Sequence, residues 1–388
     1  METNLKSLFL LTPDVTYLNF GSFGACPKPI FDSYIKYQYE LESEPVQFFT
    51  TIGPKYLNQS RVSLGAYIHC HADDVVMVPN PSHAVNLVAR SLHLQPGDEI
   101  LTTNLEYGAC DKAWDFICTA SGAKYVQQHI SLPLTTKEEF VAEFFKGLTS
   151  KTKLVFISHI TSSTALRLPV EEICTEAKKH GLLTFVDGAH APGHVPLNMQ
   201  QLQADFYTGA CHKWMMTPKG CSFLYTHKES QHLLEPLIVS WGYKALFPSH
   251  SQFIDLHQFN GTRDFSAYLT IPDSIQFMAD HNWEHVSNGC RQLVKNHASV
   301  LAELLQTQPL APLTDDFILQ MLSLELNTSE PEKFQRHLFE KYKIEIPVMR
   351  LGSKVYIRYS INAFNNAIDL EKLHAALTTE MASRNFIS

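Results

Sequence analysis

The stretch "YTGACHKWMMTPKG" (Tyr207–Gly220) places a histidine and a lysine inside a run of apolar and small residues. The pair is His212 and Lys213, and the run closes with Pro218 and Gly220. Burying a lysine costs free energy unless its amine is paired or deprotonated. Two interpretations follow: an amine kept ready to form an imine with a carbonyl, or an exposed lysine whose stem lies along apolar surface. The rest of the sequence is needed to choose between them.

The composition is that of a large and mildly acidic globular protein. The chain has 388 residues, of which 45% are hydrophobic, and a net charge of -8 from 39 acidic and 31 basic residues. This length exceeds that of one simple domain. No basic run or tail stands out, which argues against a nucleic-acid partner. No stretch has the length of a membrane span, and the N-terminus does not have the pattern of a signal peptide, so we expect no membrane partner.

Eight cysteines are spread from Cys26 to Cys290 without a CxxC pair. In a chain of this length they predict reduced thiols and a cytoplasmic location. The stretch HCHADD (residues 69–74) has two interpretations, a metal site or a polar turn before a strand. We favour the turn and expect no metal, because the spacing provides no fixed metal-ligand frame.

Strands and helices alternate through the first two thirds of the chain. Strands are expected at Val75–Val78, Glu99–Thr103, Lys153–Ile160, Leu182–His190, within DFYTGACHK, and at Cys221–His227. Helical patterns follow several of them, for example PVEEICTEAKKHG. This alternation predicts an α/β fold with a mainly parallel sheet that is covered on both faces.

The pattern changes after about Gln252. A long helical stretch is expected from Tyr268 to about Gln306, followed by MLSLEL, a helix near Pro331–Tyr342, and VYIRYS. These elements predict a second, smaller α+β domain. We expect a large cofactor-binding domain at residues 25–250, and a small domain formed by residues 1–24 and 251–388.

Polar residues at the ends of the expected strands form a set, and ligands of parallel sheets bind at such ends. Ser82 begins a helix after the first strand, as an anion-binding residue or a plain helix cap. Asp187 ends LLTFVD, where a carboxylate is either paired with a cation or serves as a cap or turn residue. Lys213 follows 26 residues later. A phosphate site, a buried carboxylate and an imine-forming lysine together predict pyridoxal 5'-phosphate as cofactor.

Ten short motifs in order give the chain a specific resemblance. It resembles the class V aminotransferase family of fold-type I pyridoxal-phosphate enzymes, and within it the isopenicillin N epimerase-like branch. The motifs are YLNFGSFG (Tyr17–Gly24), EPVQFF, NPSHAVN, LEYGA, SHITSSTALRLPV, VDGAHAPGH, ADFYTGACHKW, SWGY, GTRDFSAYL and VYIRYS. The resemblance covers nearly the whole chain. It implies a seven-stranded, mainly parallel sheet in the large domain and a homodimer with shared active sites.

The resemblance also implies roles at the cofactor. Lys213 would be the Schiff-base lysine and proton carrier, and Asp187 would pair with the pyridine nitrogen. Tyr107 would stack on the ring, where the desulfurase branch has histidine. The phenolate side of the ring would be met by His190, where that branch has glutamine, and by Thr161 or Ser162. The phosphate would be held by Ser82, the amide of His83, His212 and, from the neighbouring subunit, Thr262.

The substrate side is expected to centre on Arg358. Alternation places it on one face of the strand VYIRYS. The resemblance implies that its guanidinium clamps the α-carboxylate of an amino acid by a bidentate pair, with Asn19 as a weaker candidate. A structural ion pair on a solvated strand face is the alternative. Two departures leave the substrate open: Ala210 stands where relatives have Ser or Asn, and Phe364 where Tyr is usual.

The resemblance leaves three reactions open after the α-proton is removed. Return of the proton to the opposite face gives epimerisation, its return to the cofactor gives transamination, and loss of a β-sulfur group gives C–S lysis. A persulfide route is not expected, because no cysteine lies between Met321 and Arg358. A non-enzymatic cofactor-binding regulator is the remaining class, and the intact Lys213, Asp187 and Arg358 argue against it.

Overall fold

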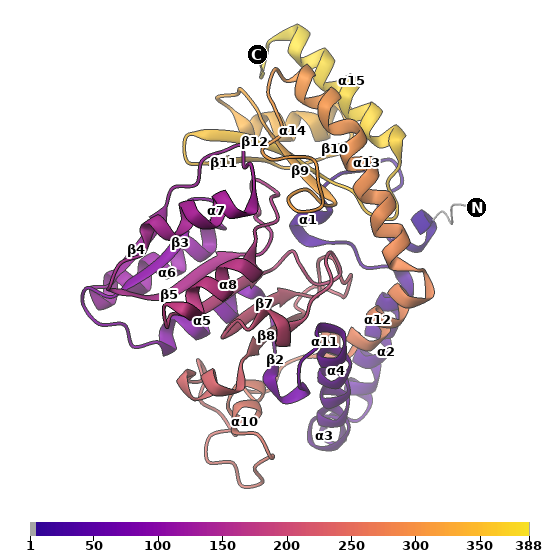
Figure 1. Ribbon diagram of the computed structural model, residues 1–388. Coiled ribbons are helices and arrows are strands. Elements are labelled where there is room, and N and C mark those ends of the chain that lie inside the picture. The colour runs from indigo at the N-terminus through magenta and orange to yellow at the C-terminus, as the bar shows by residue number, and fades with distance from the viewer. Residues whose placement is uncertain (1–4, 388) are drawn as a thin grey trace.

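A computed structural model describes residues 5–387 of the chain. Its largest sheet contains β2 (Val75–Val78), β3 (Glu99–Thr103), β4 (Lys124–Gln128), β5 (Thr152–Ser158), β6 (Leu183–Gly188), β7 (Phe206–Ala210) and β8 (Ser222–Thr226). The strand order is β2-β8-β7-β6-β5-β3-β4 (Figure 1). Neighbouring strands are parallel except around β8, which is antiparallel to both β2 and β7. The expected seven-stranded, mainly parallel sheet is therefore confirmed.

Six of these strands lie where the sequence predicts them, and β2 and β3 have the predicted bounds. The individual strand predictions missed β4, whose sequence is KYVQQ. This strand forms the edge of the sheet, and none of its residues is buried. Because an edge strand keeps polar side chains in solvent, it lacks the apolar run that identified the other strands.

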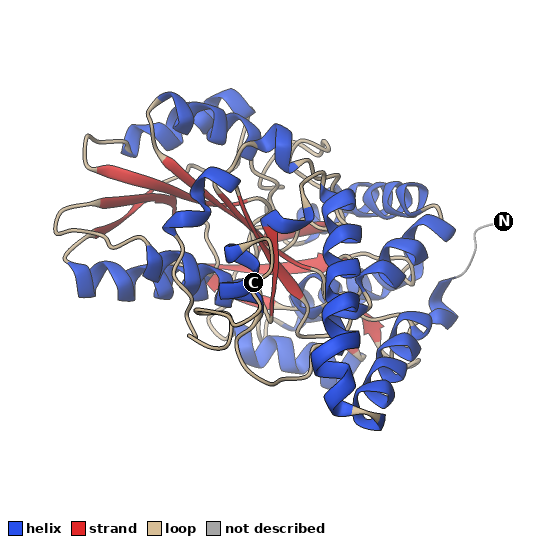
Figure 2. Cartoon of the chain, turned by 90° about the horizontal axis from the view of Figure 1, so that it is seen from below, coloured by secondary structure: helices blue, strands red, loops and turns tan. Residues whose placement is uncertain are grey.

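Helices cover both faces of the sheet (Figure 2). They include α5 (Pro81–Ser91), α6 (Gly108–Ser121), α7 (Lys137–Phe144), α8 (Val170–Lys179), α9 (Met199–Leu202) and α10 (Gln252–Gln258). Strand β5 shows why the sheet needs two covers. Val155 and Ile157 enter one hydrophobic cluster, whereas Leu154 and Phe156 enter the other. All four are fully buried, as expected for a strand whose side chains alternate between two covered faces.

The N-terminal helices pack against the middle of the chain. Helices α2 (Lys28–Ser43), α3 (Pro45–Gln47) and α4 (Gly53–Ile68) lead toward the sheet, and a π-helical turn at Phe48–Ile52 precedes α4. Both α2 and α4 contact α11 (Ser266–Leu269) and α12 (Ile271–Asp280). Short 3-10 turns lie at Leu5–Leu8, Ala72–Asp74, Phe145–Gly147 and Lys228–Leu233.

The helical stretch predicted from Tyr268 to about Gln306 is present, but it is divided into separate helices. The chain forms α12 and then α13 (Trp283–Leu304), which are separated at His281 and Asn282. Asn282 has a φ of 47°, in the left-handed region, which ends the helical path. The apolar periodicity continues on both sides, so the pattern of hydrophobic residues does not reveal the break.

A second sheet carries the C-terminal part of the chain. Strands β9 (Met321–Glu325), β11 (Val348–Leu351) and β12 (Lys354–Ser360) pair antiparallel in the order β11-β12-β9, and α14 (Pro331–Tyr342) and α15 (Ala367–Ser383) complete this part. Strand β1 (Thr16–Tyr17) pairs with β10 (Ile344–Glu345), which joins the N-terminal segment and α1 (Phe20–Phe23) to it. The domain boundaries at residues 24/25 and 250/251 stay a prediction. Within residues 5–387, no helix is long and apolar enough to cross a membrane.

Candidate active site

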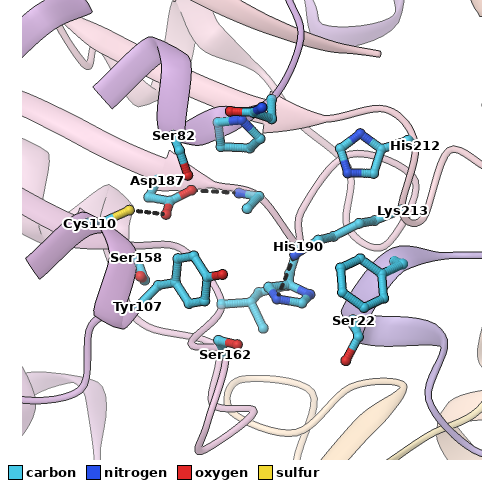
Figure 3. Close-up of a pocket in the computed structure, with 15 residues that line it drawn as sticks. Ser22, Ser82, Tyr107, Cys110, Ser158, Ser162, Asp187, His190, His212 and Lys213 are labelled. Carbon is cyan, nitrogen blue, oxygen red and sulfur yellow. Dashed lines mark hydrogen bonds between the residues drawn. The ribbon is translucent and has the colours of Figure 1, made fainter. Parts of the chain in front are cut away.

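A cavity of about 170 Å³ lies outside the carboxyl ends of β2, β5, β6 and β7 (Figure 3). Seven of the predicted residues line it: Ser82, Tyr107, Ser162, Asp187, His190, His212 and Lys213. Its wall also includes residues that the sequence did not single out, among them Ser22, Phe23, Cys110 and Ser158. The strand ends therefore bring most of the predicted cofactor residues to one place.

Asp187 lies near the end of β6, where it is 3% exposed. Its Oδ1 accepts the amide N–H of Ala189 at 2.9 Å, and its Oδ2 accepts the thiol of Cys110 at 3.4 Å. Burial raises the pKa of Asp187, while the Ala189 amide and the charge of Lys213 oppose that rise. A buried carboxyl group with such weak partners fits a protonated ring nitrogen, which would stabilise its charged form.

Lys213 reaches the cavity from the turn between β7 and β8. Its Nζ lies 3.2 Å from Nε2 of His190. Burial, followed by the charge of Arg358, lowers the pKa of Lys213 to about 8. About one tenth of the amine is then uncharged at pH 7, far more than for an exposed lysine, and this favours the imine-forming interpretation.

The N-terminal segment packs directly on the lysine turn. Gly24 has a φ of +66°, in the left-handed region. A Cβ at this position would lie 2.3 Å from the carbonyl oxygen of His212 and 2.8 Å from that of Lys213. Only glycine permits this approach, so the segment ending at Gly24 helps to hold the lysine turn in place.

The start of α5 differs in one detail from the prediction. Asn80, not Ser82, is the N-cap, because Oδ1 of Asn80 accepts the amide N–H of His83 at 2.9 Å. Ser82 instead lies within the first turn and lines the cavity. The His83 amide is thus engaged by the cap, and its role in phosphate binding stays a prediction.

His212 faces the same end of the cavity. Its Nδ1 donates to the carbonyl oxygen of Cys221 at 2.9 Å, which leaves Nε2 for a ligand. Burial lowers the pKa of His212 to about 4. A bound phosphate would favour protonation of Nε2, since a nearby anion stabilises the charged imidazole. Ser82, His212 and the start of α5 therefore fit an anion.

The two alternatives for the phenolate side separate in the structure. Ser162 lines the cavity. Thr161 is fully buried in the adjoining turn, where its Oγ1 accepts the amide of Leu166 at 2.8 Å and lies 2.7 Å from Oγ1 of Thr164. Thr262 is exposed and lies outside this cavity, so its role toward a neighbouring subunit stays a prediction.

Arg358 lies on β12 and is 1% exposed. Its Nη1 donates to the carbonyl oxygen of Ser162 at 2.7 Å, and its Nη2 to Oγ of Ser22 at 2.9 Å. Ser22 in turn donates to Asn19 Oδ1, and Nδ2 of Asn19 donates to Glu345 at 3.0 Å. Arg358 belongs to no ion pair within residues 5–387, and its Nε has no partner there.

The environment of Arg358 contradicts the alternative of an ion pair on a solvated strand face. Burial lowers its pKa to about 10, which still leaves the guanidinium charged at neutral pH. A buried cation held only by neutral oxygen atoms is costly unless an anion joins it. Ser22 and Ser162, which it contacts, line the cavity, so an anion bound there lies within its neighbourhood.

The sequence analysis missed a buried carboxyl group beside the site. Glu106 is 1% exposed and accepts hydrogen bonds from Thr103 Oγ1, Ser158 N and Ser158 Oγ. Burial raises the pKa of Glu106 to about 8. Glu106 directly precedes Tyr107 in LEYGA, and this position could have identified it as a residue near the site. Cys110 follows Tyr107 by three residues, on α6, and could have been identified in the same way.

No group of three or more His, Cys, Asp or Glu side chains in the described chain is arranged to hold a metal ion. His71, from the HCHADD stretch, accepts the amide N–H of Asp73 through its Nδ1 and so caps the short turn before β2. This is the polar turn that the sequence analysis favoured.

Comparisons with known proteins identify a family and a fold. The profile of the family "Aminotransferase class-V" matches residues 25–373. An isopenicillin N epimerase of Amycolatopsis lactamdurans is 31% identical, over 96% of this chain and 97% of its own. A probable chloroplastic L-cysteine desulfhydrase of Arabidopsis thaliana is 28% identical, over 94% of this chain and 82% of its own. The apo structure of a cysteine desulfurase from Thermococcus onnurineus NA1 superposes with a TM-score of 0.84 at 20% identity, covering 98% of both chains.

Proposed function

We propose that this chain, which belongs to the aminotransferase class-V family and is a pyridoxal-phosphate enzyme of fold-type I, removes and returns the α-proton of an amino acid or a peptide-like amino acid. One observation carries the proposal. The Lys213 amine, the Asp187 carboxylate and the Arg358 guanidinium are grouped around one cavity, either lining it or bonded to residues that do. These groups supply a proton carrier, a partner for a cationic ring nitrogen and an anchor for a carboxylate.

The residues around the cavity fit the cofactor. Ser82 and His212 would hold its phosphate, Tyr107 would cover its ring, and Asp187 would keep its nitrogen protonated. Pyridoxal phosphate supplies an electron sink for the electron pair that remains when the α-proton leaves. Lys213 takes up that proton, and its lowered pKa suits this task near neutral pH.

Arg358 would orient the substrate. Its fork of N–H donors matches an α-carboxylate, and this contact fixes which bond of the α-carbon faces Lys213. Nη1 and Nη2 now hold the carbonyl of Ser162 and the hydroxyl of Ser22, both of which a carboxylate can replace or join. A substrate with a free carboxylate beside its amino group is therefore expected.

Epimerisation or racemisation is the outcome best supported by similarity. The epimerase from A. lactamdurans matches nearly the full length of both chains. The test incubates the purified protein with single enantiomers in D₂O and follows α-deuteration, enantiomer ratio and keto acids separately. Deuteration with loss of optical purity supports the proposal. A keto acid that keeps the substrate's side chain, formed in step with substrate loss and without change of enantiomer ratio, would instead establish transamination.

C–S lysis is the second candidate, because the Arabidopsis relative is a probable cysteine desulfhydrase. Loss of a sulfur group from the β-carbon needs the same α-proton removal and no protein thiol. Cys110, which lines the cavity, donates to Asp187 and has its pKa raised by burial, so it is not a reactive thiolate. Release of pyruvate and sulfide from cysteine would decide for this candidate, whereas a persulfide on the protein would contradict it.

A homodimer is the expected assembly. Large apolar side chains stand in solvent in the segment between β8 and α10, including Trp241 at 82% and Phe247 at 94% exposed. The same part of the chain leads to Thr262, which is expected at the phosphate of the neighbouring subunit. An apolar surface of this kind marks an interface. Light scattering should give twice the chain mass at assay concentration, and an active monomer would falsify the shared site.

We propose that the protein is located in the cytoplasm. All eight cysteines are free thiols, and six of them are buried. Such a set is stable in a reducing environment. Fractionation of cells with detection of the native chain tests this location, and recovery from a secreted fraction would contradict it.

A further inference from the structure

Two buried histidines and a tryptophan form a layered group beside the cavity. His194 is neutral, with its proton on Nδ1. This follows from its partners: Nδ1 lies 3.0 Å from the carbonyl oxygen of His190, and Nε2 lies 3.0 Å from the amide nitrogen of Gln320. A carbonyl oxygen only accepts and an amide N–H only donates, so the two ring nitrogens have fixed roles.

The same reasoning fixes the proton of His190. The indole Nε1 of Trp214 lies 3.4 Å from Nδ1 of His190. An indole N–H can only donate, so Nδ1 must present a lone pair. Burial lowers the pKa of His190 well below its usual range, which agrees with a neutral ring. The proton of His190 therefore sits on Nε2, which faces Lys213 at 3.2 Å.

We propose that Trp214 is a positioning residue that fixes His190 as the Nε2–H tautomer, so that His190 always donates a hydrogen bond into the cavity. Without cofactor, the acceptor is the amine of Lys213. Only an uncharged amine has a lone pair to accept this bond, so the arrangement favours the free base of Lys213. An ammonium at Lys213 would need a lone pair on Nε2 of His190 as its acceptor. The proton of His190 would then lie on Nδ1, where it would point at the N–H of the Trp214 indole.

A second part of this inference rests on the proposed function. If pyridoxal phosphate binds as proposed, the donor of His190 would meet the phenolate oxygen of the ring, which can accept it. A histidine held as a donor has no lone pair toward the cavity. His190 is therefore excluded as the base that returns a proton to the second face of the α-carbon.

The packing around Trp214 shows why it can hold one tautomer. Its ring stacks on that of His194, with centroids 3.9 Å apart and planes 21° apart, and it also contacts Phe20 at 5.0 Å. Gly193 has a φ of +81°, and a Cβ there would lie 2.4 Å from the carbonyl oxygen of Trp214. The ring contacts with His194 and Phe20 restrict rotation of the indole, and the close approach of Gly193 restricts the backbone that carries it.

The first experiment reads the tautomer directly in the full-length chain without added cofactor. Imidazole ¹⁵N signals are recorded, and those of His190 are identified by their loss in His190→Gln. The expected result is a protonated Nε2 and an unprotonated Nδ1 between pH 6 and 8. A proton on Nδ1, or a doubly protonated ring, overturns the proposal. This measurement does not depend on any variant of Trp214 or on enzymatic activity.

The second experiment compares Trp214→Phe with Trp114→Phe. Trp114 is also a fully buried indole, but its Nε1 has no partner among residues 5–387, so it controls for lost volume. The rate of imine formation on adding pyridoxal phosphate is followed by absorbance against pH. Other groups near Lys213 could also shift this pH profile, and none of them is changed in either variant. They are Arg358, Asp187, Cys110, His190 and His212.

In Trp214→Phe, His190 can move its proton to Nδ1 and accept from the Lys213 ammonium, so the pKa of Lys213 should rise. The midpoint of the pH profile should move up by about one unit, the scale of one hydrogen bond to a charged group, while Trp114→Phe leaves it in place. An unchanged midpoint in Trp214→Phe, or an equal shift in both variants, overturns the proposal. If the wild-type chain forms no imine, the proposed function fails, and the ¹⁵N measurement still decides the tautomer.

Discussion

The two halves of the site are built in different ways. The cofactor half consists of Ser82, Asp187, His212 and Lys213, which stand at the ends of neighbouring strands or the start of the next helix. The substrate half consists of Arg358 on β12 and Ser22 from the N-terminal segment, 336 residues away in sequence. Asp187 and His212 have partners in the same sheet or its connections, whereas the Arg358 guanidinium holds only neutral oxygens within residues 5–387.

This difference indicates what each half still lacks. In the proposed cofactor half, a carboxylate, an amine and a helix start already line one cavity. The substrate half has a buried cation whose Nε is unpaired. The proposed substrate carboxylate would neutralise this cation, and its binding and orientation would then be coupled.

The largest effect on the proposed cofactor half is expected from Lys213→Ala. We expect loss of the borohydride-reducible imine and a drop in turnover of about 10³-fold or more, because both the amine and the proton carrier disappear. Mass spectrometry after reduction should locate the cofactor on Lys213 in the wild type. Lys219→Ala, six residues along the same turn, is the control and should keep the imine. A reducible imine in Lys213→Ala would remove Lys213 from the mechanism.

The substrate half should fail in another way. In Arg358→Ala and Arg358→Lys we expect the imine to remain, while kcat/KM falls about 30- to 5,000-fold, the equivalent of about 2–5 kcal/mol for a charged bidentate contact. Lysine should not rescue, since a point charge does not reproduce the fork. Arg350→Lys, on the neighbouring strand β11, is the matched control because its guanidinium is exposed and donates to Ser329 O.

The same variants sharpen the role of Arg358 when an amino acid is compared with its decarboxylated amine. Wild type should strongly prefer the amino acid, and Arg358→Ala should lose that preference. If the mutant keeps it, the carboxylate is bound elsewhere, and the division of the site into two halves is wrong.

A milder change to the cofactor half is Asp187→Asn. The amide keeps the volume and can still bind cofactor, but it cannot hold the ring nitrogen protonated. We expect turnover to fall by about 100-fold or more, the scale of one preorganised electrostatic contact. Asp111→Asn is the control, because Asp111 bonds Tyr125 and Gln127 away from the cavity. Equal turnover in Asp187→Asn and wild type would refute the pairing with the ring.

The smallest expected effect concerns the junction of the two halves, in Gly24→Ala. The added Cβ meets the lysine turn at a positive φ, so we expect about 1–3 kcal/mol lower stability and reduced imine formation. Gly181→Ala has nearly the same φ, +68°, with open space around its Cβ. Gly181→Ala should lose only the stability that a residue with a side chain loses at a positive φ, and it should still form the imine. Equal denaturation midpoints in the two variants would show that the contact between residue 24 and the lysine turn does not affect stability.

The sequence predicts the cofactor half better than the substrate half, and the reason is geometric. Asp187 and Lys213 stand where buried strands end, and parallel strands end at one edge of a sheet. Ser22 sits in a quoted motif, yet no rule of spacing joins it to Arg358, because their contact depends on how the chain ends meet. Small residues such as Ser22 also carry little chemical signal of their own.

The errors in the fold have a similar origin. Strand β4 escaped prediction because an edge strand needs no apolar run, and the break at Asn282 escaped because periodicity continues across it. The N-cap was placed on Ser82 although Asn80 was equally suited by type. In each case the outcome depends on where the residue lies in the tertiary structure. The buried strands, in contrast, could be predicted from their runs of apolar residues.

The pairing of β1 with β10 and of Ser22 with Arg358 has a consequence for how the protein is made. A ribosome releases the chain from its N-terminus, at about 5–20 residues per second, and domains form as they emerge. Residues 16–17 and Ser22 therefore lack these partners until residues 344–360 leave the exit tunnel. Newly made chains should gain the ability to capture cofactor earlier than the ability to select a substrate.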